Sequence, residues 1–278
     1  MEFHHAVARI AVWNLAQFTP SNDERFLNQV KGLAILDAEV VVLVEVKPLA
    51  YIDRLSEGLS HLGLAYHTAI LPQPFHDMNI GILHKPGVQV DNLALLDGSE
   101  YVETDATGVA RKKGRQAMTA DIRIAEFSAH LIGVHLKSGR GATQQRLRDA
   151  QCKAIGAYIA AYKTAPGQSD DTVLLMGDFN MIPGQDVSNF HHLGGEDIMD
   201  FLSSWDLQDR FSHILPGGPA NLLDGYAISR VPIKRRAYIR GSLRLFPLHW
   251  TMDMGRARFR DEVSDHLPFI ASFRIYGL

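Results

Sequence analysis

Three absences limit what this sequence can encode. It has a single cysteine, Cys152, so an intrachain disulfide is excluded. No stretch approaches the roughly 18 apolar residues that a membrane-spanning helix needs, and residues 1–12 contain no apolar run of signal-peptide length. The net charge of −3 gives no overall attraction to nucleic acid. We therefore expect a cytoplasmic protein without disulfides or membrane spans.

The composition is that of an ordinary globular protein. Its 278 residues are 46% hydrophobic and 21% charged, which suffices for one large core or two small ones. No internal repeat, low-complexity segment or convincing linker divides the chain. We therefore expect residues 1–278 to form a single domain.

Short, almost continuous apolar runs predict strands that are buried on both faces. They occupy residues 9–15, 39–46, 80–84, 117–125, 127–136, 172–180, 226–233 and 267–276. Apolar residues at helical spacing predict helices at residues 23–38, 48–63, 142–162 and 196–205. The third of these leaves Arg148 on its polar face, and residues 86–113 are turn-rich and weakly patterned. Mixed connections between apolar strands favour an α/β fold of two packed sheets covered outside by helices.

The most informative stretch is the strand at residues 172–180. Four apolar residues precede Gly177, Asp178, Phe179 and Asn180, so two polar side chains lie where the strand ends. Because strand side chains alternate, Asp178 and Asn180 point the same way and Phe179 points into the core. A carboxylate beside a carboxamide can hold a water molecule and a phosphoryl oxygen together. Taken alone, the pair is explained more simply by an Asx turn.

Other polar residues also lie at the ends of apolar strands. They are Asn14, Glu45, His135, Asp265 and His266. Each has an ordinary explanation alone: an ion pair for Glu45, a core position for His135 and a turn for the Asp–His pair. Because burial should favour apolar residues there, convergence of the strand ends on one site explains them together. Carboxylates and imidazoles in one site are typical of metal-dependent hydrolysis.

These residues belong to a series of motifs that runs along nearly the whole chain. The motifs are Trp13-Asn14, Glu45, HLKS at 135–138, GDFN at 177–180, LLDGYAIS at 222–229 and SDH at 264–266. With these motifs the sequence resembles the endonuclease/exonuclease/phosphatase superfamily, whose members share the deoxyribonuclease-I-like fold. The resemblance implies a four-layer α/β/β/α sandwich and a Mg²⁺- or Mn²⁺-dependent phosphoesterase with its site at one edge of two sheets.

The resemblance assigns a role to each metal-side residue. Glu45 is implied to be the principal metal ligand, and Asn14 and Asp265 to complete the metal surroundings. Asp178 and Asn180 are implied to orient the attacking water and the scissile phosphate. The metal would lower the pKa of water and neutralise phosphoryl charge.

The resemblance also implies the groups that handle protons and bind substrate. His266 would be the general base or a charge stabiliser, held in its tautomer by Asp224. His135 would contact the phosphate from the other side. The cations implied to bind substrate are Arg115, Lys137 and Arg140.

The sequence departs from the family pattern at two positions. Ala16 stands where some DNA-repair members carry an acidic residue. Met78 stands where deoxyribonuclease-like members carry the glutamate that pairs with the histidine corresponding to His135. Asp77, Asn79 or no residue at all are the remaining options for that partner. The second departure weakens a detailed likeness to deoxyribonucleases.

The substrate must be inferred from local charge, because the loops carry no readable motif. Residues 230–260 contain a single acid and several aromatics, which suits a polyanion with stacking bases or, equally, a solvated surface. The cations of this basic stretch are Arg230, Lys234, Arg235, Arg236, Arg240, Arg244, Arg256, Arg258 and Arg260.

Three functions follow from these observations. The preferred hypothesis is a metal-dependent nuclease that cleaves phosphodiester bonds in DNA or RNA. The second is a phosphatase or phosphodiesterase acting on a small phosphate ester, an inositol phosphate or a phospholipid headgroup. The third is an inactive binding scaffold, and the complete set of site residues argues against it.

Overall fold

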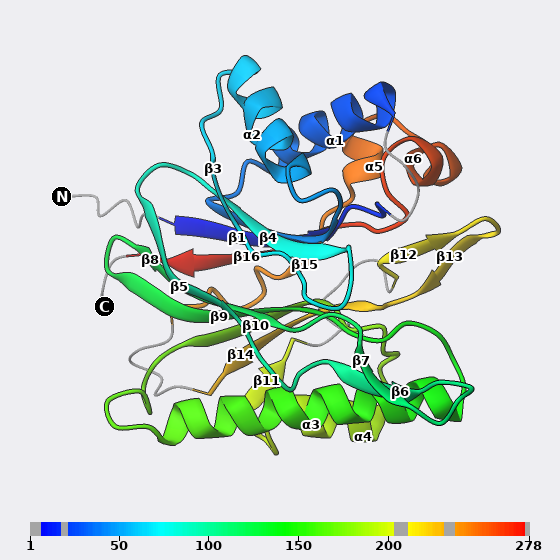
Figure 1. The fold of residues 1–278 in the computed structure, drawn as a ribbon. Coiled ribbons are helices and arrows are strands. Elements are labelled where there is room, and N and C mark those ends of the chain that lie inside the picture. Colours follow the sequence, from blue (N-terminus) through cyan, green and yellow to red (C-terminus); the bar gives the residue numbers. More distant parts are fainter. Residues whose placement is uncertain (1–6, 18–21, 203–210, 231–236, 276–278) are drawn as a thin grey trace.

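The computed structural model of this chain has four layers (Figure 1). It describes residues 7–17, 22–202, 211–230 and 237–275. Two six-stranded sheets face each other, and helices cover their outer faces. This is the α/β/β/α sandwich that the sequence predicts. One sheet is covered by α1 (Asp23–Leu36), α2 (Tyr51–His61), α5 (Leu248–Thr251) and α6 (Arg256–Glu262), and the other by α3 (Ala142–Thr164) and α4 (Val187–Leu193).

The first sheet, called sheet A, has one parallel pair at its centre. Strands β1 (Val7–Asn14) and β2 (Val40–Val46) run parallel, and the other neighbours pair antiparallel. On one side of this pair lie β16 (Phe269–Arg274) and β15 (Arg244–Leu245), and on the other lie β4 (Asn79–His84) and β3 (His67–Ile70).

The second sheet, called sheet B, repeats this plan. Strands β9 (Phe127–His135) and β10 (Val173–Asp178) are its parallel central pair, and the other neighbours pair antiparallel. Beside β10 lie β14 (Asp224–Ser229) and β11 (Met199–Phe201), and beside β9 lie β8 (Met118–Ile124) and β5 (Val88–Leu95). Two hairpins stand apart from the sheets: β6 (Tyr101–Thr104) with β7 (Ala110–Lys113), and β12 (His213–Leu215) with β13 (Gly218–Asn221).

The central strands are apolar throughout because each of their faces is buried in a different core. In β10, Leu174 and Met176 belong to the large core that includes sheet A, whereas Val173 and Leu175 pack against Ile155 of α3. Successive side chains of the strand therefore point alternately into two different hydrophobic cores. No helix in the described part of the chain is long and apolar enough to cross a bilayer.

Gly177 is required where β10 approaches β9. Its φ is 151°, and a Cβ placed there would lie 1.9 Å from the carbonyl oxygen of Val134. We expect Gly177→Ala to lower the free energy of unfolding by about 2–4 kcal/mol, because the backbones must separate. Urea unfolding would measure the loss. Gly217→Ala, where nothing lies within 4 Å of the added Cβ, should change stability little. Equal stabilities for the two variants would contradict this explanation.

One prediction about an individual segment is wrong, and one segment without a prediction contains strands. The helix expected at 196–205 is instead a turn followed by the edge strand β11, and residues 203–205 lie outside the described residues. Pairing with β14 and edge-on packing of Phe201 against Phe179 and Phe190 outweigh the helical spacing there. The turn-rich segment 86–113 contains β5, β6 and β7, whose many exposed positions left no continuous apolar run.

The two parallel pairs bring the predicted polar residues to one edge of the sandwich. Strands β1 and β2 end at this edge in sheet A, as β9 and β10 do in sheet B. The antiparallel neighbours β16 and β14 begin there, so Asp224 lies opposite Asp178 in the strand register. The shared carboxyl-terminal edge therefore contains polar residues from both sheets.

Candidate active site

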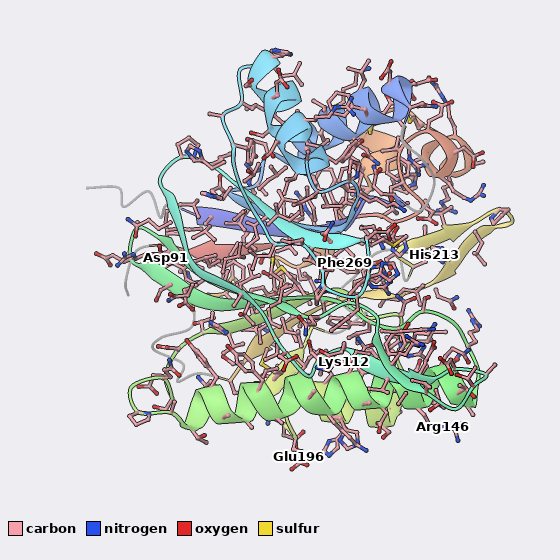
Figure 2. All side chains as sticks on the ribbon, viewed as in Figure 1. Asp91, Lys112, Arg146, Glu196, His213 and Phe269 are labelled. Carbon is pink, nitrogen blue, oxygen red and sulfur yellow. The ribbon has the colours of Figure 1, made fainter. Side chains whose placement is uncertain are left out.

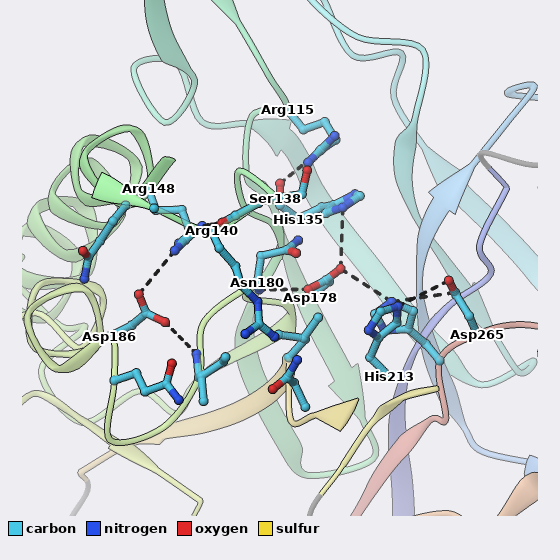
Figure 3. Close-up of a pocket in the computed structure, with 18 of the residues that line it drawn as sticks. Arg115, His135, Ser138, Arg140, Arg148, Asp178, Asn180, Asp186, His213 and Asp265 are labelled. Atoms are coloured by element: carbon cyan, nitrogen blue, oxygen red, sulfur yellow. Dashed lines mark hydrogen bonds and ion pairs between the residues drawn. The ribbon is translucent and has the colours of Figure 1, made fainter. Parts of the chain in front are cut away.

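A cavity of about 1110 Å³ opens at this edge (Figure 3). Most of the residues singled out from the sequence line it, and Asn14 and Asp224 lie directly behind it, hydrogen-bonded to residues that do. Lys137 is the exception and does not reach the lining. The predicted residues that line the cavity are Glu45, Arg115, His135, Arg140, Asp178, Asn180, Asp265 and His266.

A bulge near the end of β2 turns Glu45 into the cavity. The register with β4 shifts between Leu43 and Val46, and Glu45 has a left-handed backbone with φ 62°. Residues other than glycine rarely adopt this conformation, and those that do cluster at functional sites. Glu45 is 8% exposed, and burial raises its pKa. A cation bound beside it would favour the ionised carboxylate.

Asn14, the last residue of β1, links the two sheets. Its Nδ2 donates to Glu45 Oε1 at 3.3 Å and to Asp178 Oδ2 at 3.2 Å. Its Oδ1 accepts the N–H of Ala16 at 2.9 Å. Asn14 therefore holds two carboxylates at a fixed separation, and its contact with a metal stays a prediction.

Asp178 and Asn180 face the cavity from the end of β10. Asp178 Oδ1 accepts the N–H of Asn180 at 2.9 Å, so the Asx-type hydrogen bond of the simpler interpretation is also present. Asn180 has φ 50°, and its Nδ2 donates to the Leu136 carbonyl at 3.2 Å. Burial, together with the nearby Asp224 carboxylate, raises the pKa of Asp178. The pair is thus held rigidly at the wall of the cavity.

His266 and Asp224 form the shortest side-chain pair of the site. His266 Nδ1 lies 2.6 Å from Asp224 Oδ2, and its Nε2 lies 4.0 Å from Asp178 Oδ2. The Trp13 indole N–H donates to the His266 carbonyl at 2.9 Å, and the His266 N–H donates to Ser264 Oγ at 2.9 Å. Burial alone would lower the pKa of His266, but the Asp224 carboxylate and its hydrogen bond raise it to about 10. The expected Asp–His pair is therefore present.

His135 lies between two carboxylates. Its Nε2 is 3.6 Å from both Glu45 Oε1 and Asp178 Oδ2. Burial and the neighbouring Arg115 guanidinium hold its pKa well below the usual range, so the imidazole is uncharged. Neither candidate partner meets it, because Asp77 pairs with Lys47 and Asn79 donates to the Val46 carbonyl. In the described chain, the acidic neighbours of His135 are therefore those of the site itself.

The predicted substrate-binding cations differ in their positions. Arg115 is buried and donates to the carbonyls of His135 and Leu136, at 3.1 and 3.0 Å, so it supports the wall of the cavity. Arg140 is exposed, and its side chain reaches into the cavity (Figure 3). Lys137 instead donates to the Ser138 carbonyl and lies 5.7 Å from the centre of the Tyr101 ring. Arg140 is therefore the cation best placed to meet a substrate.

Comparison with solved structures identifies the fold. The chain superposes on the zebrafish (D. rerio) TDP2 complexed with a single-stranded DNA product with a TM-score of 0.69 at 17% identity, over 96% of this chain and 99% of that one. The human Nocturnin catalytic domain gives 0.65 at 17% identity, over 96% and 94% of the two chains. ANGEL2, a 2′,3′-cyclic phosphatase, gives 0.62 at 16% identity, over 96% and 95%. The chain has the deoxyribonuclease-I-like fold.

This result confirms the fold that the motifs implied, over nearly the full length of the chain. No family model matches the sequence, and no curated protein matches it. Sequence identities of 16–17% establish a similar backbone fold. The chemistry of this protein must be inferred from the residues of its own site.

Sequence reasoning missed His213, which lines the cavity from the base of the β12–β13 hairpin. Figure 2 shows it at the edge where the two sheets meet the hairpin. Its backbone forms an antiparallel bridge with His266, and the two ring centroids lie 4.8 Å apart. No motif surrounds His213, and the contact depends on long-range pairing, so the sequence contains no signal for it.

Sequence reasoning also misplaced Arg148, which the helical pattern assigned to a polar face. Its side chain is buried and donates to the carbonyls of Lys137 and Gly139, at 3.0 and 2.6 Å. It also pairs with Asp186 at 3.3 Å, and Asp186 accepts the N–H of Ile182 at 2.8 Å. Arg148 therefore joins the two loops that form one rim of the cavity, where a solvent-facing arginine was expected.

Two groups of described side chains place their ligand atoms close enough to hold a metal ion. One consists of Asp178, Asp224 and His266, and the other of His213, Asp265 and His266. Within each group the ligand atoms lie within 4.8 Å of one another. The first group is already joined by the short His266–Asp224 contact. Glu45 belongs to neither group. It is linked to Asp178 through Asn14, which donates a hydrogen bond to each of the two carboxylates.

Proposed function

We propose that this protein is a divalent-cation-dependent phosphoesterase, specifically a nuclease that hydrolyses phosphodiester bonds of DNA or RNA. The observation that carries the proposal is the buried His266–Asp224 pair facing Asp178 across a cavity that Glu45 also enters. The TDP2 structure of the same fold, which holds a single-stranded DNA product, supports a nucleic-acid substrate. The expectation that residues 1–278 form a single domain is part of this proposal.

The cation would be Mg²⁺ or Mn²⁺, held by Glu45 and Asp265. The donor set fits, because buried carboxylate oxygens are what these hard cations bind. Asp265 lines the same cavity and has one carboxylate oxygen, Oδ1, without a hydrogen-bond partner among the described residues. When bound, such a cation neutralises phosphoryl charge and lowers the pKa of water.

The remaining side chains would bind and orient the reacting groups. Asp224 fixes the Nδ1 side of His266, so Nε2 is the atom that exchanges a proton or stabilises charge in the cavity. Asp178 offers Oδ2 as acceptor for the attacking water, and Asn180 is held beside it by the backbone bond. The uncharged His135 would contact the phosphate on the far side.

The second candidate is a phosphodiesterase or phosphatase for small esters, and the charge distribution favours it. The basic stretch predicted to bind a polyanion is partly neutralised where it is described: Arg258 pairs with Glu262 and Arg260 with Asp261, at 2.7 and 2.6 Å, and Arg230 pairs with Asp200 at 2.7 Å. Residues 231–236 lie outside the described residues. The 2′,3′-cyclic phosphatase ANGEL2 shares the fold, so a cyclic nucleotide belongs among the test substrates.

One experiment separates the candidates. The protein would be incubated with Mg²⁺ or Mn²⁺ and with plasmid, single-stranded DNA, single-stranded RNA, bis-p-nitrophenyl phosphate, inositol phosphates or a 2′,3′-cyclic nucleotide. Cleavage of a polynucleotide that EDTA abolishes supports the nuclease. Hydrolysis of the small esters alone supports the second candidate. Lack of hydrolysis with every substrate and both metals supports an inactive scaffold.

Arg140 offers a test of substrate contact. We expect Arg140→Ala to raise KM about 10-fold with little change in kcat, because an exposed guanidinium contributes roughly 1–2 kcal/mol to binding a phosphate. Arg146 is the matched control, since it is an exposed arginine of α3 that donates to Thr143 and does not line the cavity. Steady-state kinetics on the best substrate would measure both. An equal rise in KM for the control would point to a general charge effect.

A further inference from the structure

The β12–β13 hairpin places a second imidazole, that of His213, next to His266. His213 Nε2 lies 3.5 Å from Asp265 Oδ2, and His266 Nε2 lies 3.8 Å from Asp265 Oδ1. The two oxygens of one carboxylate therefore face two different imidazoles. The three side chains are mostly buried but still line the cavity, with 20%, 13% and 7% of their side-chain surface exposed for His213, Asp265 and His266.

The backbone fixes this arrangement before any ligand arrives. The Ile214 N–H donates to the Asp265 carbonyl at 2.7 Å, and the Leu267 N–H donates to the Ser212 carbonyl at 2.8 Å. Ser212 Oγ accepts the N–H of Asp224 at 3.0 Å, which joins the hairpin to the His266 partner as well. Such preorganisation favours ion binding, because little conformational entropy is lost on assembly.

The spacing of the ligand atoms suits a tetrahedral ion. With ligand bonds of about 2.0–2.2 Å, two ligands of a tetrahedral zinc ion lie about 3.4 Å apart. His213 Nε2 lies 3.5 Å from Asp265 Oδ2, close to this value, and His266 Nε2 lies 3.8 Å from the other oxygen, Oδ1. One ion would therefore be held by both carboxylate oxygens, or by one of them after a small rotation of the carboxylate. One ligand atom from each of the three residues already lies within 4.8 Å of the others. Asp265 Oδ1 and His213 Nδ1 are also buried without hydrogen-bond partners among the described residues. An ion would give the carboxylate oxygen the partner it lacks.

We propose that His213, Asp265 and His266 form a second cation site, which shares Asp265 with the proposed Mg²⁺ site, is selective for borderline divalent ions such as Zn²⁺, and inhibits the enzyme when occupied. Two imidazoles and one carboxylate are a donor set of zinc sites, whereas Mg²⁺ prefers an all-oxygen set such as that around Glu45. Binding would release the Nε2 proton of His266 to solvent. The inhibitory role rests on the proposed function, because it requires His266 Nε2 to act in turnover; ion binding itself does not.

Cobalt binding tests the site without reference to activity. The metal-free protein would be titrated with CoCl₂ and followed by visible absorption, which is intense for tetrahedral Co²⁺. We expect the wild type to develop the intense absorption of one tetrahedral ion, whereas an ion in the oxygen-rich site around Glu45 would absorb weakly. In His213→Gln we expect at least about a 10-fold loss of affinity in the intense absorption. His192→Gln is the matched control, because His192 lies 3.6 Å from Asp149 in a His–Asp pair on α3 and α4, outside both convergent groups. Cobalt binding that survives unchanged in His213→Gln overturns the site.

Zinc inhibition tests the consequence. Turnover would be measured at saturating Mg²⁺ with increasing ZnCl₂ and expressed as a fraction of each variant's own zinc-free rate. We expect His213→Gln to need at least about 10-fold more zinc for half inhibition than the wild type or His192→Gln. Identical zinc sensitivity in all three overturns the inhibitory role. If no phosphate ester is hydrolysed, the proposed function fails, while the cobalt titration still decides whether the site exists.

Discussion

Glu45→Gln is expected to remove metal-dependent turnover, with a loss of about 10²–10³-fold or more in kcat/KM. The substitution keeps the size of the side chain but removes the charge that would hold the cation, and several kcal/mol of transition-state stabilisation are lost with it. Because burial raises the pKa of Glu45, the ionised form is disfavoured in the folded chain. The metal-free variant should therefore be at least as stable as the wild type at neutral pH.

Glu100 provides the control for the expected effects of Glu45→Gln on turnover and on stability. It is also a buried glutamate, 5% exposed, but it lies outside the cavity and accepts from Lys112 and Gln116. Burial alone would raise its pKa, but these partners lower it overall. Glu100→Gln should therefore keep activity and lose stability. Kinetics with varied Mg²⁺ and urea unfolding would measure both variants, and near-normal turnover in Glu45→Gln would refute its role as a ligand.

His266→Ala is expected to lower kcat/KM by about 10²–10⁴-fold, the range for losing a general acid–base group. Asp224 holds the imidazole at Nδ1, and the side chains of Trp13 and Ser264 hold the His266 backbone, so Nε2 is the ring atom that faces the cavity. Asp224→Asn should produce a large part of the same loss. Because the pair acts as a unit, the double variant should be little worse than His266→Ala alone.

His135→Ala is expected to cost less than His266→Ala. The His135 imidazole is uncharged and stands 3.6 Å from each carboxylate, beyond a normal hydrogen bond, without a dedicated acidic partner. Single-turnover rates on one substrate would rank the two variants. The reverse order would mean that His135, not His266, carries the main proton-transfer or charge-stabilising role.

Much of the fold and of the site was predictable because both follow from strand patterning. Runs such as that ending at Asp178 are apolar on both faces. A charged residue at the end of such a run is noticeable because burying a charge is unfavourable unless it is paired or binds a metal. Since parallel neighbours end at one edge, Asn14, Glu45 and His135 could be expected together. The motifs then implied the four-layer sandwich with its site at one edge, which apolar periodicity alone does not determine.

The parts that failed depend on contacts that no local pattern encodes. His213 reaches the site only through the register of its hairpin with residue His266, over fifty positions away. Arg148 looks like a solvent-facing helix residue until two loops close over it. In each case a contact with a residue distant in the sequence determines the role of the side chain, and the local sequence does not show it.

The division of the site between the two sheets has a consequence for how the protein loses activity. Asn14 holds a carboxylate from each layer, and the histidine contributed by the chain before β16 is clamped by an aspartate that begins β14. Sliding of one layer over the other by a single ångström would pull these pairs apart while every helix and strand stayed intact. The catalytic rate should therefore respond to a shift between the two sheets that circular dichroism does not detect. At low denaturant concentrations, activity should be lost before the secondary structure.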